Sequence, residues 1–472
     1  MIYLIVILIY LFTLTGIGIY KSSQVKTQAD FSVAGRTLSP WVMVLTMLAV
    51  WIGTGSIVGN AEEAYRTGKA ALIIPLGTFI GMILLSLIAT QARNIEASSV
   101  PEIIGSRFGQ IARILAVISL IIAYMVIVSY QFNAGGAVIE VITDREVTKE
   151  TATLIAAAFI IAYTMLAGLK SLASMDIVTG SIITISLLIA FPVLLIKAGG
   201  FAGMQAAYEA MPDRATHMQF WHVYSPVQII NYLLPTFLLV MGDANQYQRI
   251  FASRNARGAK QAVIVLIFAA LTIELLIIAS AWVAGSMTPD PANGKYILIY
   301  AARHYMPFAL SLFFMVTVVG VIISTADSFL LVPATTFIND IYSTYINPKA
   351  SQKKIIFISR FLVVIFGVIA YLVTHAFAEA TGFFKKALYA YTIYGSAITP
   401  SLVAALFWKK ATKQGAIASI LAGTVVTLAW SEMDFVRDAL PVWASELDAV
   451  LPAITVSVIA LVVVSLLTAR KD

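Results

Sequence analysis

Apolar runs of about twenty residues recur along the whole chain and are separated by short polar stretches. A helix of about 20 apolar residues crosses the ~30 Å hydrocarbon core of a bilayer, and lipid offers the backbone no other hydrogen-bond partners. The pattern therefore predicts an all-α polytopic membrane protein with about thirteen transmembrane helices. We number these segments 1 to 13: 2–20, 40–61, 69–92, 111–138, 152–170, 174–197, 225–247, 260–287, 307–335, 354–375, 386–408, 413–431 and 449–468.

The connections between the segments are short, and the longest is the stretch 198–224. If the N-terminus lies outside, 20 of the 31 lysine and arginine residues fall in cytoplasmic connections and 11 fall outside. Cytoplasmic loops are enriched in these residues, so we expect an outside N-terminus and a cytoplasmic C-terminus in a cell membrane. We treat 1–472 as one transmembrane domain without an attached catalytic or output module.

Composition supports the membrane assignment and narrows the classes of function. Hydrophobic residues make up 60% of the chain and charged residues only 12%, which is more apolar surface than a soluble protein can bury. The net charge of +7 does not indicate nucleic-acid binding, because the basic residues are scattered among short loops. The absence of cysteine excludes disulfides, thiolate metal sites and cysteine nucleophiles. We expect lipid, an ion and a solute as partners, and infer no obligate protein partner.

Two glycines, Gly53 and Gly55, stand near the middle of segment 2. Each weakens a helix by about 1 kcal/mol relative to alanine, so a locally unwound stretch is expected there. Unwinding would free the carbonyl groups of Ala49 and Ile52 to bind a cation. Close packing between helices explains the same small residues equally well.

Segment 9 places two hydroxyls side by side, at Ser324 and Thr325, and a carboxylate three residues after the first, at Asp327. Positions three apart lie on nearly the same helix face. Hard oxygen ligands of this kind suit a monovalent cation that is released in each cycle, and sodium is the natural guest. The alternative is that both hydroxyls bond back to their own helix.

Two more acidic residues lie at or inside predicted spans. Asp176 opens segment 6, where it either caps the helix or completes a second cation site with Ser324, Asp327 and Ser328. Glu274 lies near the middle of segment 8, where a carboxylate costs several kcal/mol unless it is protonated, paired or solvated. It either bonds to a neighbouring helix as a protonated group, or binds the solute or a coupling proton.

Segment 7 carries Pro235, which removes one backbone hydrogen bond within the span. This predicts either a second broken helix or a simple kink. Interrupted segments 2 and 7 stand five spans apart, which is the spacing of inverted repeats around a central site. The predicted repeats are 39–197 and 225–408, with 1–38 before them and two helices in 409–472 after them.

Polar and aromatic side chains within the spans are candidates for contacting a solute. Each tyrosine taken alone is more often a packing residue. The candidates are Trp51, Thr54, Ser56, Gln131, Asn133, Asn231, Thr236, Glu274 and Tyr391.

The predicted interior contains the carboxylates of Asp176, Glu274 and Asp327 but no mid-span lysine or arginine. A neutral, zwitterionic or cationic solute therefore fits better than an anionic one. Backbone amides at a broken helix can still hold a carboxylate, so amino acids and monocarboxylates stay open.

Several strings, in order along nearly the whole chain, resemble the sodium:solute symporter family. Besides the glycines of segment 2, they are Phe31-Ser32-Val33-Ala34-Gly35-Arg36-Thr37-Leu38, Gln248-Arg249-Ile250-Phe251-Ala252-Ser253-Arg254-Asn255, Ser324-Thr325-Ala326-Asp327-Ser328, Asn339-Asp340-Ile341-Tyr342 and Phe407-Trp408-Lys409-Lys410-Ala411-Thr412-Lys413-Gln414-Gly415-Ala416.

The resemblance implies a five-plus-five inverted-repeat fold of the LeuT type, with one helix before the core and two after it. It implies a main sodium site formed by the carbonyl groups of Ala49, Ile52 and Val321 and the hydroxyls of Ser324 and Thr325. Some members place a second sodium near an aspartate matching Asp176, and its segment-9 ligands would be Ser324, Asp327 and Ser328.

Segment 2, from Thr46 to Tyr65, most resembles the branch that contains choline transporters. There the tryptophan matching Trp51 helps to face a quaternary ammonium. Such an interaction is worth about 0.5–2 kcal/mol per ring, so recognition takes several rings. The matching places near Ile127 and Asp243 are not aromatic in this chain.

The sequence thus predicts a secondary transporter that couples sodium to a small polar organic solute, such as an amino acid, a sugar or a choline-like amine, by alternating access. Sodium is the coupling ion. The alternatives are sodium-coupled uptake of a monocarboxylate or vitamin, and a solute channel, which would need a continuous polar pore. An enzyme is not expected, because no histidine and cysteine cluster or nucleophile–base pair lies within the spans.

Overall fold

Every predicted segment forms a helix in the computed structural model, which describes residues 2–22, 25–143, 146–166, 168–375, 382–433, 441 and 447–469. Within these residues, twelve helices are long and apolar enough to cross a membrane, and a bent pair forms a thirteenth span. The only strand-like pairing in the described part is one isolated bridge between Leu38 and Ser253. The predicted all-α class with about thirteen spans is confirmed.

The described elements, in chain order, are α1 (Ile2–Ser22), α2 (Gln28–Val33), η1 (Ala34–Arg36), α3 (Pro40–Trp51), η2 (Gly55–Asn60), α4 (Ala61–Thr67), η3 (Gly68–Ile73), α5 (Pro75–Asn94), α6 (Val100–Phe108), α7 (Gln110–Ile142), α8 (Lys149–Leu166), α9 (Leu169–Lys197), α10 (Gly200–Glu209), η4 (Pro212–Met218), α11 (Pro226–Gly242), α12 (Ala244–Ala252), α13 (Ala256–Ser286), η5 (Pro291–Tyr296), α14 (Ile297–Tyr305), α15 (Phe308–Phe337), η6 (Ile338–Ile346), α16 (Gln352–Val373), α17 (Phe383–Phe407), α18 (Lys413–Glu432) and α21 (Val450–Thr468).

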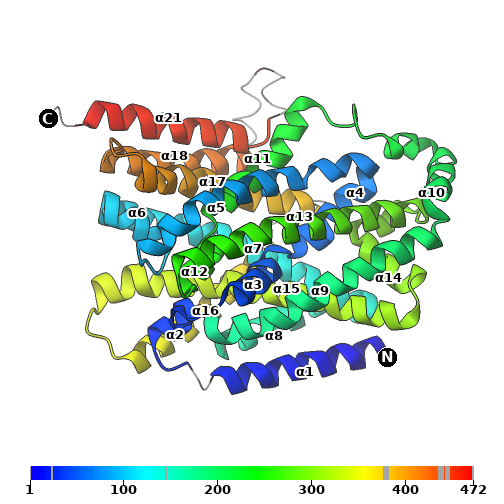
Figure 1. Ribbon diagram of the computed structural model, residues 1–472, viewed down its shortest axis with the longest axis horizontal. Helices are drawn as coiled ribbons and strands as arrows, with labels where there is room; N and C mark the ends of the chain where they lie inside the picture. The colour runs from blue at the N-terminus through cyan, green and yellow to red at the C-terminus, as the bar shows by residue number, and fades with distance from the viewer. Residues whose placement is uncertain are drawn as a thin grey trace.

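The long helices run along one direction of the molecule (Figure 1). Helix α1 lies along one edge of the bundle, α18 and α21 lie along the opposite edge, and α3, α7 and α15 pass through the middle. The two chain ends lie at opposite ends of the bundle, as an odd number of spans requires. The site described below lies among the central helices.

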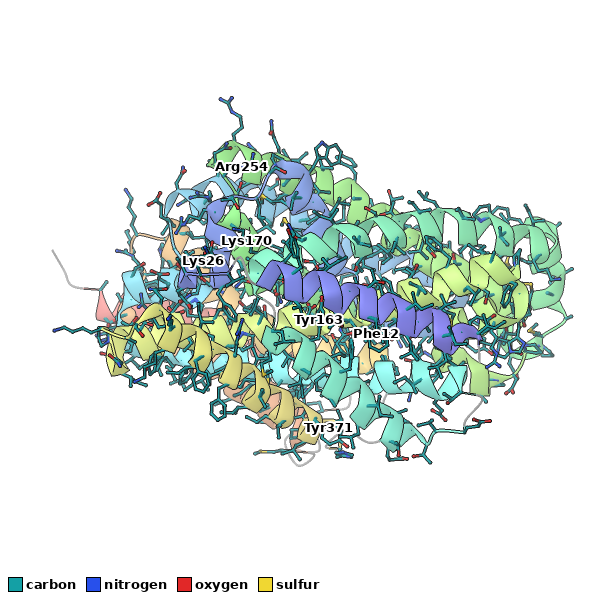
Figure 2. All side chains as sticks on the ribbon, turned by 90° about the horizontal axis from the view of Figure 1, so that it is seen from below. Phe12, Lys26, Tyr163, Lys170, Arg254 and Tyr371 are labelled. Atoms are coloured by element: carbon teal, nitrogen blue, oxygen red, sulfur yellow. The ribbon has the colours of Figure 1, made fainter. Side chains whose placement is uncertain are left out.

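The outer surface of the bundle is apolar, as a lipid-facing surface should be. Figure 2 shows Phe12 on the outer face of α1, and its side chain is 74% exposed. In the same view Lys26, Lys170 and Arg254 lie towards the end of the bundle that is opposite the N-terminus. These three basic residues therefore lie near one end of the bundle, whereas Phe12 lies on an outer surface that suits contact with acyl chains.

Polar caps fix the starts of several spans. Ser225 accepts a hydrogen bond from the backbone N–H of Gln228, whose side chain accepts one in return from the Ser225 N–H. Asn255 and Thr412 cap α13 and α18 in the same position. Each cap satisfies a backbone N–H that has no partner inside the helix, so these helices begin where the sequence supplies an oxygen.

The first helix interruption falls where the glycines predicted it. Helix α3 ends at Trp51, Ile52 has extended dihedral angles, and the axis bends by 55° before the span continues from Gly55. A Cβ atom on Gly53 would lie 2.8 Å from Thr325 Cγ2, and one on Gly55 would lie 2.5 Å from the Tyr391 hydroxyl. The glycines therefore permit both the unwinding and the close approach of two other helices.

The second interruption lies eight residues after the predicted position. Pro235 is inside α11, whereas the helix stops at Gly242 and restarts after Asp243, whose ψ angle is 110°. The prediction of a break at Pro235 is wrong. Side chains satisfy the backbone at the true break: Tyr394 donates to Gly242 O at 2.7 Å, and the N–H of Asn245 donates to Asp243 Oδ1 at 3.1 Å.

The prediction that Asp176 opens a helix is also wrong. Helix α9 begins at Leu169 after an N-cap at Gly168, so Asp176 lies about two turns inside the helix. A Cβ atom on Gly168 would lie 2.8 Å from Phe31 Cδ2, which shows how tightly the chain turns at that point. Asp176 is therefore a buried acid inside a span and not a cap.

Candidate functional site

The broken end of α3 faces two hydroxyls of α15. Ser324 Oγ lies 3.4 Å from the carbonyl oxygen of Ala49, and Thr325 Oγ1 lies 3.5 Å from those of Val50 and Ile52. All five residues are in the protein interior. The last carbonyl groups of a helix have no partner within it, so the break presents free acceptors to this space.

The hydroxyls of Ser324 and Thr325 point away from their own helix. Their hydrogen bonds run to α3 and to Asp176, whose Oδ1 accepts from Ser324 Oγ at 2.6 Å. Thr317, on the same helix, instead donates back to Phe313 O at 2.9 Å. The alternative that the pair only bonds to α15 does not describe these two side chains.

Val321 completes the predicted set of main sodium ligands. It lies on α15 one helical turn before Thr325 and is fully buried. The structure thus brings together the segments that carry all five predicted ligands, Ala49, Ile52, Val321, Ser324 and Thr325. Their assignment as sodium ligands stays a prediction.

A buried arginine joins the second group of predicted cation ligands. Arg249 Nη2 lies 3.2 Å from Asp176 Oδ2 and 2.9 Å from Ser328 Oγ, and its Nε donates to Thr46 Oγ1 at 3.0 Å. The hydroxyl of Thr46 in turn bonds to Asp176. One guanidinium therefore joins α12 to α3, α9 and α15.

Arg249 adds a buried positive charge near the end of a span, where none was predicted from the sequence. Arg249 lies within the span Pro226–Ala252, and its side chain is 0% exposed. Hydropathy had ended segment 7 at residue 247, because the string around Arg249 is polar. The sequence around Arg249 indicated family resemblance but no role for the arginine at the site, and no sequence pattern indicated a role for Thr46.

Asp327 adds a second carboxylate beside the Arg249 pair. It interacts electrostatically with both Asp176 and Arg249, and Ser328 Oγ donates to its Oδ1 at 3.3 Å. Asp176, Ser324, Asp327 and Ser328 therefore gather as predicted for a second cation site. The cluster thus holds two carboxyl groups and one guanidinium.

A small enclosed cavity of about 20 Å³ lies beside the helix break. Trp51 Nε1 donates to Glu274 Oε1 at 2.8 Å across it. Five of the nine predicted solute contacts line it: Trp51, Ser56, Thr236, Glu274 and Tyr391. The other lining residues are Gly55, Asn60, Ile74, Thr78, Phe384, Ala387 and Leu388.

Two further predicted contacts, Thr54 and Gln131, lie next to the break instead of lining the cavity. Their side chains hydrogen-bond to each other, and both are buried. A Cβ atom on Gly53 would lie 3.1 Å from Gln131 Nε2, so this pair adjoins the hydroxyl of Thr325. The pair supports the unwound backbone.

The last two predicted contacts, Asn133 and Asn231, do not line the central cavity. Asn133 lines a separate pocket of about 150 Å³ with Thr374 and Phe383, and Asn231 lines another of about 290 Å³. Asn133 follows Gln131 by two residues, which turns a helical side chain by about 200°. Hydropathy identifies the span but not the helix face.

The connection after α10 covers the far end of α4. Arg214 lies over the Tyr65 ring with Cζ 4.2 Å from the centroid, and donates to Thr288 O at 2.9 Å. His217, also in η4, bonds to Tyr65 O at 3.1 Å, and burial lowers the pKa of its imidazole. These residues line a vestibule of about 620 Å³ that also contains Glu62 and Arg66.

A helical bundle in which two interrupted helices meet buried oxygen ligands is the architecture of a LeuT-type secondary transporter. Solved structures agree. A Na⁺-coupled sialic acid symporter in a substrate-bound outward-open state matches with a TM-score of 0.82 at 17% identity, covering 99% of this chain and 98% of that one. MhsT in complex with L-phenylalanine matches with a TM-score of 0.59 at 14% identity, covering 92% and 99%.

The chain belongs to the Sodium:solute symporter family, whose sequence profile matches residues 31–423. The osmoregulated proline transporter OpuE of Bacillus subtilis is 24% identical over 98% of this chain and 94% of its own length. The human high affinity choline transporter 1 is 27% identical over 91% of this chain and 77% of its own length. The family resemblance inferred from the sequence is confirmed.

Proposed function

We propose that this chain carries sodium and a small polar solute together across a cell membrane by alternating access. The observation that carries the proposal is the broken end of α3, where the carbonyl groups of Ala49 and Ile52 face the hydroxyls of Ser324 and Thr325. A sodium ion held there, with the carbonyl of Val321, binds α3 to α15. The ion binds more tightly to the state in which α3 and α15 are together than to the state in which they are apart. This difference in sodium affinity between the two states couples the ion to the solute.

A second sodium ion is accommodated by Asp176, Ser324, Asp327 and Ser328. The excess of one carboxyl group over the single guanidinium supports the assignment, because a bound monovalent cation would balance the second carboxylate when it is ionised. Ser324 contributes to both sites, since its hydroxyl lies between Ala49 O and Asp176 Oδ1. Two sodium ions therefore bind in adjacent positions on α15.

The solute binds beside Trp51 and is neutral, zwitterionic or cationic. The cavity of about 20 Å³ holds about one water molecule, so it widens when the solute binds. The similarity to proline and choline transporters supports a small polar solute. The buried arginine does not change the sign of the preference, because Arg249 is already paired with Asp176 and bonded to Ser328. It offers no free positive charge to an anionic solute.

The chain is oriented with its N-terminus outside and its C-terminus in the cytoplasm. The position of Lys26, Lys170 and Arg254 towards the end opposite the N-terminus supports this orientation, because basic residues favour the cytoplasmic side (Figure 2). The vestibule under Arg214 then lies on the outer side, and the Arg249 cluster lies on the cytoplasmic side of the cavity.

Reconstituted protein tests the coupling. A thermal-shift screen of solutes with and without sodium identifies the solute, and its uptake into proteoliposomes is then measured against the sodium gradient. Ser324→Ala and Thr325→Ala should each abolish sodium-driven uptake. Thr317→Ala is the matched control, because it removes a buried hydroxyl of α15 that bonds only to its own helix. Uptake with unchanged sodium dependence in the two site variants would disprove the assignment.

A further inference from the structure

Glu274 presents one satisfied and one unsatisfied oxygen in the central cavity. Its side chain is only 2% exposed, near the middle of α13. Oε1 accepts a hydrogen bond from Trp51 Nε1 at 2.8 Å, whereas Oε2 has no hydrogen-bond partner among the described residues. The hydroxyl of Thr78 on α5 interacts with the Glu274 carboxylate, although it does not reach hydrogen-bond geometry with either oxygen. A carboxylate oxygen can accept more than one hydrogen bond, so Oε2 is able to accept from a further donor that enters the cavity.

The charge of the cavity determines the kind of donor. Among the described residues that line it, Glu274 is the one whose side chain is a carboxylate, and none is a lysine or arginine. Two arginines described above are both paired, Arg249 with Asp176 and Arg66 with Glu63 at 2.8 Å. A positively charged group of the solute is therefore the complement of Glu274.

The hydrogen-bonding capacity of Glu274 Oε2 restricts which positively charged groups can bind to it. A carboxylate oxygen accepts hydrogen bonds, and an ammonium with at least one N–H can donate one, whereas a quaternary ammonium cannot. The rings of Trp51, Phe384 and Tyr391 line the rest of the cavity and suit a short carbon skeleton. The Trp51 ring is held in position by its bond to Glu274, so the ring and the carboxylate form one preorganised pair.

We propose that Glu274 binds the solute directly, through a protonated amine that carries at least one N–H. The inference rests on the proposed transport function and specifies its substrate class: primary, secondary or tertiary ammonium compounds, cationic or zwitterionic. Trp51 is the positioning residue, because it holds Glu274 Oε1 and leaves Oε2 facing the cavity. The affinity for such a solute then depends on the charge of residue 274, whereas the affinity for sodium does not.

Binding of defined probes to the purified full chain tests this assignment. The probes are ethanolamine and L-proline, which carry N–H; choline and glycine betaine, which are quaternary; myo-inositol, which is neutral; and pantothenate, which is anionic. Dissociation constants are measured by calorimetry with and without sodium, for wild type and for Glu274→Gln. Glutamine has the same size as glutamate and an amide oxygen that can accept the hydrogen bond from Trp51 Nε1, so the substitution removes mainly the negative charge. Glu432→Gln is the control, because it removes a carboxylate of α18 that bonds to Tyr389 outside the cavity.

We expect an N–H amine to bind wild type in sodium, and Glu274→Gln to bind it about 10- to 100-fold more weakly, which is the effect of losing a hydrogen bond to a charged group. Glu432→Gln should bind it like wild type. The thermal shift caused by sodium alone should be the same in all three proteins, which shows that the variants are folded.

Three results would overturn the inference while leaving sodium symport intact: sodium-dependent binding of only the quaternary, neutral or anionic probes, binding of none of the amines, or equal amine affinity in Glu274→Gln. Failure of sodium to stabilise wild type at all would instead disprove the proposed function. The two failures are therefore distinguishable.

Discussion

Arg249 and Asp176 form a buried ion pair, with 3.2 Å between Nη2 and Oδ2. The other oxygen of the same carboxylate accepts a hydrogen bond from Ser324 at 2.6 Å. One aspartate thus connects the arginine that joins four helices to a predicted sodium ligand. A sodium ion bound at the proposed site would compete with Asp176 for the Ser324 hydroxyl, which would connect ion binding to the Arg249 ion pair.

Replacing Arg249 with methionine should destabilise the protein strongly. Removal of one partner leaves Asp176 as a buried, uncompensated charge, which typically costs about 3–5 kcal/mol. Thermal unfolding of the purified protein measures the loss. Adding Asp176→Asn should recover part of the stability, because Asp327 is then the one acidic member of the cluster that remains, but it should not restore sodium-driven uptake.

The control is Arg254→Met, on the same segment but exposed, where the arginine donates to Thr37 O at 2.6 Å. Its unfolding temperature should stay near that of wild type, since surface changes usually cost less than about 0.5 kcal/mol. An Arg249→Met variant as stable as wild type would show that the pair does not hold the four helices together.

Gly53→Ala should weaken sodium binding without removing any ligand. The new Cβ atom would lie 2.8 Å from Thr325 Cγ2 and 2.9 Å from its Oγ1, so the hydroxyl must move away from the carbonyl groups at the break. Overpacking of this kind costs about 1–3 kcal/mol, which corresponds to roughly a 5- to 150-fold loss of sodium affinity if it falls on the bound state. The sodium concentration that gives half of the maximal thermal shift measures it.

Gly16→Ala is the matched control for this change, because a Cβ atom on Gly16 of α1 meets nothing within 4 Å. Its sodium response should equal that of wild type. An unchanged response in Gly53→Ala would mean that Thr325 is not a ligand.

Hydropathy and glycine placement were sufficient to predict the bundle and the first helix break. Apolar runs set the spans because lipid allows no other backbone structure, and they were correct to within a few residues for most helices. They failed at residues 169–173, which begin α9 although they were assigned to the end of one segment and to a connection, and there Gly168 packs closely against Phe31. Contacts between distant segments leave no periodic signal in the local sequence.

The site was predicted less completely than the fold. Ser324 and Thr325 were predicted as cation ligands because two adjacent hydroxyls stand out in an apolar run. Arg249 was assigned to a loop because its neighbours in the sequence are polar. Its burial depends on Asp176, 73 residues away in the chain, and on Thr46. The position of the second break was also missed, because Pro235 is a stronger local signal than Gly242 and Asp243. The side chains that bond to Gly242 and Asp243 come from α17 and α7, which are distant in the chain.

Tyr124→Phe should damage the second helix break. The hydroxyl of Tyr124 on α7 donates to Asp243 Oδ1 at 2.6 Å, and Asp243 also caps α12 through the N–H of Asn245. Loss of one donor to a buried carboxylate costs about 1–3 kcal/mol. We expect lower thermal stability and slower uptake. Tyr371→Phe on α16, whose ring packs against His375, is the control and should behave as wild type. Full activity in Tyr124→Phe would show that the hydrogen bond from Asn245 N–H to Asp243 is sufficient to stabilise the helix break.

The loop over the vestibule should lose stability in mild acid because of His217. Burial lowers the pKa of His217, and the charge of Arg214 acts in the same direction, against the opposing hydrogen bond to Tyr65 O. The folded protein therefore resists a proton that the unfolded chain accepts near its ordinary pKa of about 6.5. Stability is unaffected by this group above that pH and falls as the pH drops below it, until the folded state is protonated as well.

Thermal unfolding at pH 7.5 and pH 5.5 tests this effect in wild type and in His217→Asn. The wild type should lose more stability over this interval than the variant, because asparagine keeps a polar group near Tyr65 O but takes up no proton. His304→Asn is a useful comparison, since burial also lowers the pKa of His304 but its imidazole stacks on Tyr300 away from the vestibule. If wild type and His217→Asn lose equal stability between the two pH values, protonation of His217 does not govern how the loop is held over Tyr65.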